Sequence, residues 1–281
     1  MSKPPLKWAG GKRKLLPSIM PLLPTKYNRY IEPFSGGASL FFRLKPENAI
    51  LCDINEELIN FYKILRDDHE GLIESLKKHE NTEEYYFKIR DVDRTEGYKS
   101  WTNVERASRF LYLNKTCFNG LHRVNSKGHF NVPFGNRKSP NIVDEFVLRR
   151  CSRILTTADL RTDDFKEIMP DIEQGDFIYA DPPYDPISKT ASFTGYSKED
   201  FGDADQARLK GFCEYAASAG AYFAVSNSDT EFIRDLYKDY CINTIQASRS
   251  INSKGNGRGK VNELFITNYD VEVPTTYIWE M

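Results

Sequence analysis

The chain has 281 residues, of which 40% are hydrophobic and 13% aromatic, and this is typical of a globular protein with one large or two smaller domains. It contains no run of eighteen apolar residues, so we expect no membrane span, and its first residues lack the apolar core of a signal peptide. Five widely spaced cysteines without a Cys-x-x-Cys pair favour reduced thiols in a cytoplasm, and neither they nor the four histidines have the spacing of a metal site.

The formal net charge is −1, but the basic residues are unevenly distributed. Residues 3–29 and residues 106–138 each contain seven basic side chains and no acidic one, and residues 249–260 contain four. Each stretch alone is also typical of a solvated loop. Three such stretches together favour one electropositive face that binds nucleic acid.

The first motif, at residues 6–12, is Leu-Lys-Trp-Ala-Gly-Gly-Lys, and an apolar-periodic helix is predicted after it. Gly10 lets the backbone approach a ligand closely, and free N–H groups at a helix start favour an anion. The spacing of a phosphate-binding loop is absent.

Residues 29–40 are typical of a strand, a tight glycine turn and a helix, and residues 49–53 of a second strand that ends in an acid. This is the arrangement of a nucleoside site. The turn Phe34-Ser35-Gly36-Gly37 admits the ligand, and Asp53 can accept hydrogen bonds from ribose hydroxyls. The Gly-x-Gly-x-x-Gly pattern of dinucleotide enzymes is missing, which favours S-adenosylmethionine over a nicotinamide cofactor.

Residues 56–90 and 104–115 are expected to form amphipathic helices. Residues 118–135 are glycine-rich, basic and aromatic, with Ser126-Lys127-Gly128 as the predicted turn of a β-hairpin. A β-ribbon that presents arginine and asparagine has the size and chemistry for a DNA groove. The candidates are Asn119, Arg123 and Asn131, with Arg137 in the same acid-free stretch, although an ordinary surface hairpin remains an alternative.

The α/β pattern resumes near residue 141, with a helix to about 153, a strand at 154–158, and a helix that opens at Asp164 and Phe165. A buried strand at 177–180 then leads into Asp181-Pro182-Pro183-Tyr184, and residues 188–202 have the composition of a mobile lid. A helix at 203–218, a strand at 221–225, another helix and two strands near 242–247 and 263–267 close the pattern.

The segment Asp181–Tyr184 suits the chemistry of a planar amine. The lone pair of such an amine is delocalised, so it is a poor nucleophile until two acceptors grip its hydrogens. Asp181 supplies one acceptor and the Pro182 carbonyl the other, while Tyr184 offers a flat face for stacking. In open α/β sheets ligands bind at the carboxyl ends of strands, where Asp181 is expected. An acid and a proline turn after a strand are also common without catalysis.

Taken together, Lys-Trp-Ala-Gly-Gly-Lys, Glu-Pro-Phe-Ser-Gly-Gly, Asn-Gly-Leu-His-Arg and Asp-Pro-Pro-Tyr resemble, in their order, the motifs of Dam-type DNA adenine methyltransferases. The resemblance runs from about Leu6 to Tyr269 and is stronger to restriction-associated members that methylate GATC. It implies a Rossmann-like α/β domain that uses S-adenosylmethionine, formed by residues 1–54 and 138–281. An inserted, mainly helical DNA-recognition domain with a β-hairpin would span residues 55–137.

The resemblance also implies roles for single residues. The cofactor would contact Trp8, Gly10, Lys12, Phe34, Ser35, Gly36, Gly37, Asp53, Asp164, Phe165 and Asp181. Double-stranded DNA would contact Lys7, Phe118, Leu121, Arg123 and Pro133, with Phe118 filling the gap left by a flipped adenine and Arg123 reading the first guanine. To these the composition of the loop adds Asn119, Asn131 and Arg137 as candidate DNA contacts. Family members often have tyrosine where this chain has Phe118, which keeps the stacking but loses a hydroxyl.

The implied reaction is methyl transfer to the 6-amino group of adenine in duplex DNA, without a metal and in the cytoplasm. A cognate restriction endonuclease that acts independently is an expected partner. Three alternatives stay open: an adenine methyltransferase of a different short site, a protein-amide methyltransferase, and an inactive DNA-binding protein. A protein-amide methyltransferase would not need Arg123 and three basic stretches. An inactive DNA-binding protein could lose the glycine turn, which is intact in this sequence.

Overall fold

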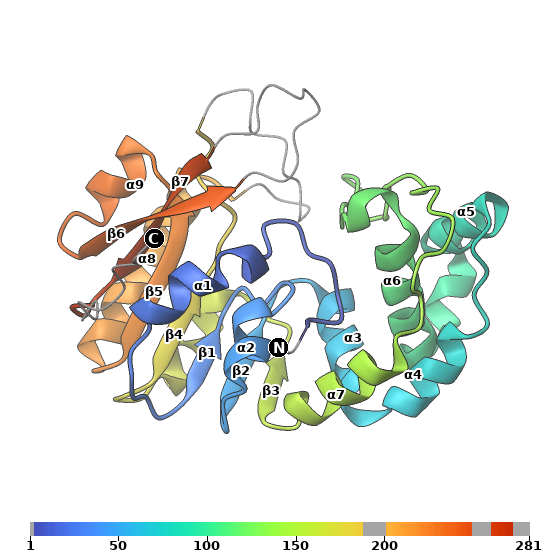
Figure 1. Cartoon of the computed structure of the whole chain (residues 1–281), viewed down its shortest axis with the longest axis horizontal. Helices are drawn as coiled ribbons and strands as arrows, with labels where there is room; N and C mark the ends of the chain where they lie inside the picture. The colour runs from blue at the N-terminus through green and yellow to red at the C-terminus, as the bar shows by residue number, and fades with distance from the viewer. Residues whose placement is uncertain (1–2, 188–200, 249–259, 272–281) are drawn as a thin grey trace, which may run out of the picture. The chain divides into compact units, whose positions relative to one another are not determined.

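The computed structural model describes residues 3–187, 201–248 and 260–271. Residues 188–200 of the predicted lid and nearly all of the third basic stretch lie outside these ranges. The strands form a mixed seven-stranded sheet in the order β3-β2-β1-β4-β5-β7-β6, and the α/β class is thereby confirmed (Figure 1). The described chain divides into two compact units, residues 3–11 with 35–164, and residues 12–34 with 165–187, 201–248 and 260–271.

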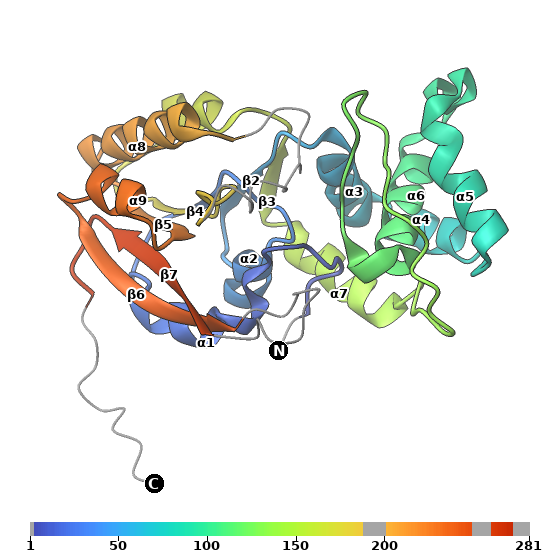
Figure 2. The same ribbon diagram turned by 90° about the horizontal axis from the view of Figure 1, so that it is seen from above.

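The first unit holds one strand pair and most of the helices. Its elements are α2 (Ser39–Leu44), β2 (Ala49–Cys52), α3 (Glu56–Asp67), α4 (His69–Leu76), α5 (Glu83–Asp91), η3 (Val92–Arg94), η4 (Glu96–Ser100), α6 (Asn103–Thr116), η5 (Phe118–Gly120), α7 (Glu145–Leu155) and β3 (Ala158–Arg161). Strands β2 and β3 pair in parallel. Figures 1 and 2 both show α4, α5 and α6 side by side, with the loop after α6 running along them.

The second unit holds the other strands. Its elements are η1 (Lys12–Lys14), α1 (Leu16–Ile19), η2 (Met20–Leu22), β1 (Tyr30–Glu32), η6 (Phe165–Asp171), β4 (Phe177–Ala180), α8 (Asp203–Ser218), β5 (Tyr222–Ser228), α9 (Glu231–Leu236), β6 (Cys241–Ser248) and β7 (Lys260–Thr267). Strands β1, β4 and β5 are parallel, whereas β7 runs antiparallel to both β5 and β6. Every residue of β4 is buried, so its apolar run forms a central strand and its carboxyl end carries Asp181.

Local capping explains why the predicted helical segment 56–90 is three helices. The side chains of Asn55, Asp68 and Thr82 each accept a backbone N–H at the start of α3, α4 and α5. Such caps satisfy otherwise unpaired donors, and each therefore begins a new helix.

The predicted strand at 154–158 is wrong, because α7 continues to Leu155 and β3 begins at Ala158. Leu148, Cys151 and Leu155 are buried at helical spacing, so the apolar face of α7 extends through this region. Along β3, buried Ala158 and Leu160 alternate with more exposed residues, which is the period of a strand.

Candidate active site and the loop after α6

Asp181 follows the last residue of β4 and pairs with a buried lysine. The Nζ atom of Lys12 lies 2.7 Å from Asp181 Oδ1, and the two side chains are only 6% and 19% exposed. Burial raises the pKa of Asp181 above its ordinary value, while the charge of Lys12 and the hydrogen bond from Lys12 oppose that rise. The second unit thus presents an anionic acceptor, charge-compensated and largely dry, at the carboxyl end of a central strand.

Tyr184 is held so that its ring and hydroxyl have different partners. The Nζ atom of Lys12 lies 4.6 Å from the ring centroid, a cation–π distance. The hydroxyl donates a hydrogen bond to Glu263 Oε2 on β7, at 2.9 Å. Burial raises the pKa of Tyr184 well above its ordinary value, so the phenol stays protonated and keeps this bond.

The turn that contains Pro182 is fixed from α8 and β5. Gln206 Nε2 donates to the Pro183 carbonyl at 2.9 Å, and Asp185 N donates to Asn227 Oδ1 at 3.1 Å. Asn227 Nδ2 in turn donates to Gln206 Oε1 at 3.0 Å. Two consecutive prolines limit backbone rotation, and these bonds fix the turn on its far side. The backbone that directly follows Asp181 is therefore held by hydrogen bonds at Pro183 and Asp185.

Phe34 and Phe165 form an aromatic surface in the second unit. Their ring centroids lie 5.2 Å apart, and Phe201 and Phe212 meet Phe34 and Phe165 edge-on at 5.8 and 5.6 Å. The guanidinium of Arg208 lies 5.1 Å from the Phe165 centroid. Phe165 and Phe212 are buried, whereas Phe34 and Phe201 are partly exposed, and an exposed aromatic face of this kind suits a planar ring such as adenine.

In the first unit Asp53 is bound to the glycine turn. Asp53 Oδ2 accepts from Gly36 N at 2.9 Å, and Oδ1 accepts from Asn55 N at 3.0 Å. Burial raises the pKa of Asp53, and these two backbone donors oppose the rise. Each carboxylate oxygen has a second lone pair, so Asp53 can still accept from the hydroxyls of a ribose. The residues therefore fit a nucleoside.

Trp8 packs directly on the same turn. A Cβ atom added to Gly36 would lie 2.7 Å from Trp8 Nε1, and one added to Gly37 would lie 2.8 Å from Trp8 Cβ. Gly36 also has a φ of +43°, which disfavours other residues. On another side the indole stacks on His122, with ring centroids 5.4 Å apart. Only glycine therefore fits at both positions of the turn.

Three further predicted residues, Ser35, Asp164 and Gly10, lie close to these groups in sequence or space. Ser35 N donates to the Cys52 carbonyl at 2.8 Å, which ties the turn to the end of β2. Cys52 Sγ lies 3.2 Å from the Asp163 carbonyl, so the half-buried Asp164 follows a segment in contact with β2. Gly10 has a φ of +73°, and Gly11 N donates to the Trp8 carbonyl at 3.1 Å, which makes this segment a tight turn.

Lys7 is anchored to α6 through its backbone. Lys7 N donates to Asn114 Oδ1 at 3.0 Å, and Asn114 Nδ2 donates to the Lys7 carbonyl at 2.7 Å. A Cβ atom on Gly120 would meet the Lys7 side chain at 2.7 Å. Partial burial and the charge of Arg137 lower the pKa of Lys7. The first unit thus brings Lys7, Arg137 and the start of the loop after α6 together.

The loop after α6 exposes an aromatic ring at its start. Phe118 is 50% exposed, Asn119 and Pro133 are exposed, and Leu121 is half-buried. Phe118 N donates to the Pro133 carbonyl at 2.9 Å, so the two ends of the loop lie together. The predicted turn forms with Gly128 N donating to the Asn125 carbonyl, but isolated bridges at Cys117–Phe134 and Val124–Phe130 stand where hairpin strands are expected.

Arg123 is exposed and oriented by Asn131. Arg123 Nε donates to Asn131 Oδ1 at 2.7 Å, and Asn131 N donates to the Arg123 carbonyl at 3.1 Å. An asparagine that holds Nε leaves terminal guanidinium N–H groups for another acceptor. Arg123 Nη2 also donates to the Asn131 carbonyl at 3.4 Å, so Asn131 orients the exposed guanidinium while further N–H groups remain for another acceptor.

Sequence reasoning missed several residues that support these groups. They are Tyr62, which donates to the Gly36 carbonyl at 2.8 Å, together with Asn114, His122, Gln206, Asn227 and Glu263. Asn227 could have been found, because it lies near the end of β5 beside β4, where strand ends meet. In residues 3–187, 201–248 and 260–271, no group of three or more His, Cys, Asp or Glu could hold a metal ion. No helix in the same ranges is long and apolar enough to cross a membrane.

Comparison with known proteins gives consistent matches along the chain. Residues 8–251 match the model of the D12 class N6 adenine-specific DNA methyltransferases. The type II methyltransferase M1.LlaDCHI of Lactococcus lactis subsp. cremoris is 44% identical over 95% of this chain and 95% of its own length. The type II methyltransferase M.MjaIII of Methanocaldococcus jannaschii is 41% identical over 95% and 99%, and the DNA adenine methylase of Escherichia coli K12 is 35% identical over 92% and 92%.

Proposed function

The chain belongs to the D12 class N6 adenine-specific DNA methyltransferase family, and we propose that it methylates the adenine of GATC in duplex DNA with S-adenosylmethionine as donor. It is an adenine-specific DNA methyltransferase. The observation that carries the proposal is the buried, charge-compensated Asp181 followed by a turn fixed from two other elements.

The target base reaches the site by leaving the duplex, because its amine is otherwise inside the stack. We assign Tyr184 to stack on the flipped adenine. Asp181 and the Pro182 carbonyl accept the two amine hydrogens, which draws the nitrogen lone pair out of the ring. Bound S-adenosylmethionine supplies an electrophilic methyl group on a sulfonium. Alignment of the amine with that group then supplies much of the rate.

We assign the cofactor contacts to the two groups of residues described above. Asp53 accepts from the ribose hydroxyls, while the Ser35–Gly37 turn, on which Trp8 packs, gives close backbone approach. Gly10, in the tight turn after Trp8, is assigned to the same ligand. The other assigned contacts are Lys12, Phe34, Asp164, Phe165 and Asp181, whose charges and aromatic faces suit the amino-acid and adenine parts of the cofactor.

Residues 55–137 are proposed as a recognition domain inserted between catalytic segments 1–54 and 138–281. The exposed Phe118 and Arg123 and an acid-free stretch between residues 106 and 138 support this division. Arg123 reads the first guanine, Phe118 fills the gap left by the adenine, and Leu121 and Pro133 pack near the thymine. The remaining proposed DNA contacts are Lys7, Asn119, Asn131 and Arg137.

The protein is proposed to act in the cytoplasm, alongside a restriction endonuclease that cleaves independently. The test of the site is base-resolution methylation mapping of plasmid DNA from a methylation-free host that expresses the chain. N6-methyladenine confined to GATC is the expected result. Methylation centred on another short sequence would contradict GATC as the site, and DNA without N6-methyladenine would contradict the activity.

A further inference from the structure

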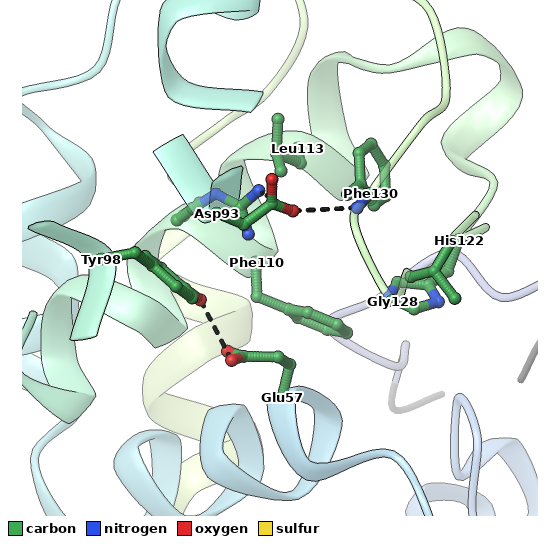
Figure 3. A pocket seen from close by; sticks show the side chains of 10 residues that line it. Glu57, Asp93, Tyr98, Phe110, Leu113, His122, Gly128 and Phe130 are labelled. Atoms are coloured by element: carbon green, nitrogen blue, oxygen red, sulfur yellow. Dashed lines mark hydrogen bonds and ion pairs between the residues drawn. The ribbon is translucent and has the colours of Figure 1, made fainter. Parts of the chain in front are cut away.

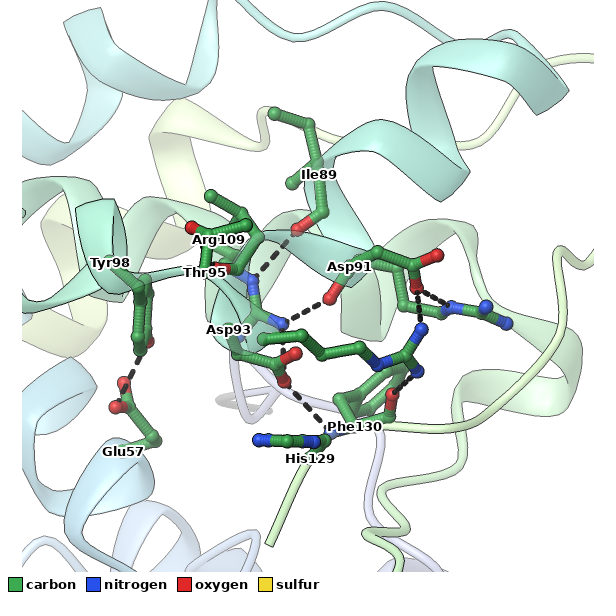
Figure 4. Close-up of polar contacts among 12 residues, drawn as sticks. Glu57, Ile89, Asp91, Asp93, Thr95, Tyr98, Arg109, His129 and Phe130 are labelled. Carbon is green, nitrogen blue, oxygen red and sulfur yellow. Dashed lines mark hydrogen bonds and ion pairs between the residues drawn. The ribbon is translucent and has the colours of Figure 1, made fainter. Parts of the chain in front are cut away.

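Phe130, a buried residue of the loop after α6, is held by a segment outside that loop. Its backbone N donates to Asp93 Oδ2 at 2.9 Å, and its carbonyl accepts from the Arg94 guanidinium at 3.3 Å. Asp93 and Arg94 both belong to η3, between α5 and η4. Both backbone polar groups of Phe130 are therefore hydrogen-bonded to side chains of η3, which lies outside the loop (Figure 4).

Asp93 is itself fixed by a buried arginine of α6. The Arg109 guanidinium lies 2.8 Å from Asp93 Oδ2, and the side chains are 6% and 9% exposed. Arg109 also donates to the carbonyls of Ile89 and Arg90 at 2.9 and 2.6 Å. The arginine thus joins α6, the end of α5 and Asp93 into one assembly. Removing either charge would leave the other buried without its partner, which is costly.

The loop borders a partly open pocket of about 70 Å³. Its lining combines the charged or polar Asp93, Arg109 and His122 with the apolar Val124 and Phe130 (Figure 3). Atoms that border a cavity have lost contacts on one side, so dispersion forces hold this part of the loop less tightly than a filled core would. The hydrogen bonds of Phe130 consequently matter more for where the loop lies.

Phe130 is adjacent to the pair that orients Arg123. The next residue, Asn131, accepts from Arg123 Nε through its side chain and donates through its backbone N to the Arg123 carbonyl. A displacement of Phe130 would therefore move Asn131 and, with it, the guanidinium of Arg123. A shift near 1 Å is enough to spoil a bidentate contact or a catalytic geometry.

We propose that Asp93, held by Arg109, is a positioning residue for sequence discrimination. It sets the place of Phe130 and thereby the aim of Arg123, and it has no contact with DNA in this role. The inference rests on the proposed reading of the first guanine by Arg123.

The test compares kcat/KM on GATC duplexes and on duplexes altered at the first base, for four variants. Asp93→Ala removes the acceptor, and we expect discrimination at that base to fall about tenfold, within the range of one bidentate guanine contact. Asp93→Asn keeps an oxygen for Phe130 N and should restore part of the loss. Arg94→Ala should give a smaller loss of discrimination. Glu96→Ala is the control, because it breaks only an exposed pair with Lys99 in the neighbouring η4.

Cofactor affinity, measured by calorimetry, should be the same in all four variants. If Asp93→Ala does not fold, Arg94→Ala carries the test together with amide hydrogen exchange at Phe130, which should be slow in the wild type and faster in the variant. If Asp93→Ala lost rate equally on every duplex, the inference would be overturned. If Arg123→Ala nevertheless lowered discrimination at the first base, the proposed function would stand. Unchanged discrimination in Arg123→Ala would overturn both the guanine reading and the role of Asp93.

Discussion

At the scale of single residues, the proposed contact of Asp53 with the ribose of the cofactor is open to a direct test. Its carboxylate accepts two backbone N–H groups and retains lone pairs for a ribose. Asp53→Ala should weaken S-adenosylmethionine binding by roughly 1.5–3 kcal/mol, as expected for a lost hydrogen bond to a charged group. Calorimetry measures this directly. DNA affinity without cofactor serves as the control and should barely change, and unaltered cofactor affinity would assign the ribose to another residue.

Arg123 and Lys127 allow a matched comparison in one loop, since both are exposed. Arginine can pair bidentately with the two major-groove acceptors of guanine, which is worth about 1–3 kcal/mol of discrimination. Arg123→Ala should therefore raise the relative rate on sites altered at the first guanine of GATC. Lys127→Ala, if that side chain touches phosphate only, should lower affinity evenly and reduce its salt dependence.

The measurement is the methylation rate on GATC and on its first-position variants, at two salt concentrations. A uniform slowing of every substrate by Arg123→Ala would mean that Arg123 positions the DNA backbone and that another residue reads the guanine.

Much of the candidate site could be predicted from short motifs, because each motif carries its chemistry within a few residues. Asp181, Tyr184 and the glycine turn are of this kind. Their supports could not be predicted, because they come from distant parts of the chain: Glu263 holds the Tyr184 hydroxyl, and Asn114 holds the Lys7 backbone. Side-chain hydrogen bonds across such separations have no periodic pattern in sequence.

At the scale of elements, α6 carries Arg109 and Asn114 and begins with a complete capping box. Thr102 Oγ accepts from Glu105 N at 3.2 Å, and Glu105 accepts from Thr102 N at 2.8 Å. Thr102→Ala should lower the free energy of unfolding by about 1 kcal/mol, the usual contribution of such a cap. Denaturant unfolding measures it. Lys99→Ala, at an exposed site nearby, should stay within about 0.5 kcal/mol of wild type, and an equal effect of both would contradict the cap.

Element types were largely predictable, whereas their boundaries were not. The helix at Asp203–Ser218 is confirmed at both ends, since polar residues and glycines border a clear pattern. Residues 154–161 were harder, because Ile154 and Leu155 are compatible with a strand as well as with the last turn of α7. Leu155 is helical because it is buried on the apolar face of α7. Tertiary contacts of that kind cannot be recognised from a few consecutive residues of the sequence.

At the scale of the whole molecule, two neutral histidines, His79 and His122, make the free energy of unfolding depend on pH. His79 lies between the Tyr85 hydroxyl and Ser108 Oγ, each at 3.0 Å. Burial lowers the pKa of His79 to about 4, and burial with the charge of Arg109 lowers that of His122 to about 4. At pH values between about 4 and 6.5, the unfolded chain binds more protons at these histidines than the folded chain does. The free energy of unfolding therefore falls as the pH falls through this range.

The free energy of unfolding should therefore drop from pH 7 to pH 5, by on the order of 1 kcal/mol for each histidine. Urea unfolding at both pH values measures the drop. His79→Gln cannot take up this proton and should show a smaller drop than wild type. The same drop in the variant would show that His79 does not contribute to the acid sensitivity.

The central claim is that Asp181 holds the target amine, and single-turnover methyl transfer to a GATC duplex tests it most directly. Asp181→Ala should fold, as circular dichroism can verify. It should nevertheless transfer no measurable methyl group, because one acceptor for the amine is gone. Cofactor is supplied above its dissociation constant for the variant and for the wild type, so that weaker binding does not mimic lost chemistry. A folded Asp181→Ala protein that keeps roughly a tenth or more of the wild-type rate would contradict the claim. Such a rate means that the substitution raises the activation free energy by less than about 1.4 kcal/mol.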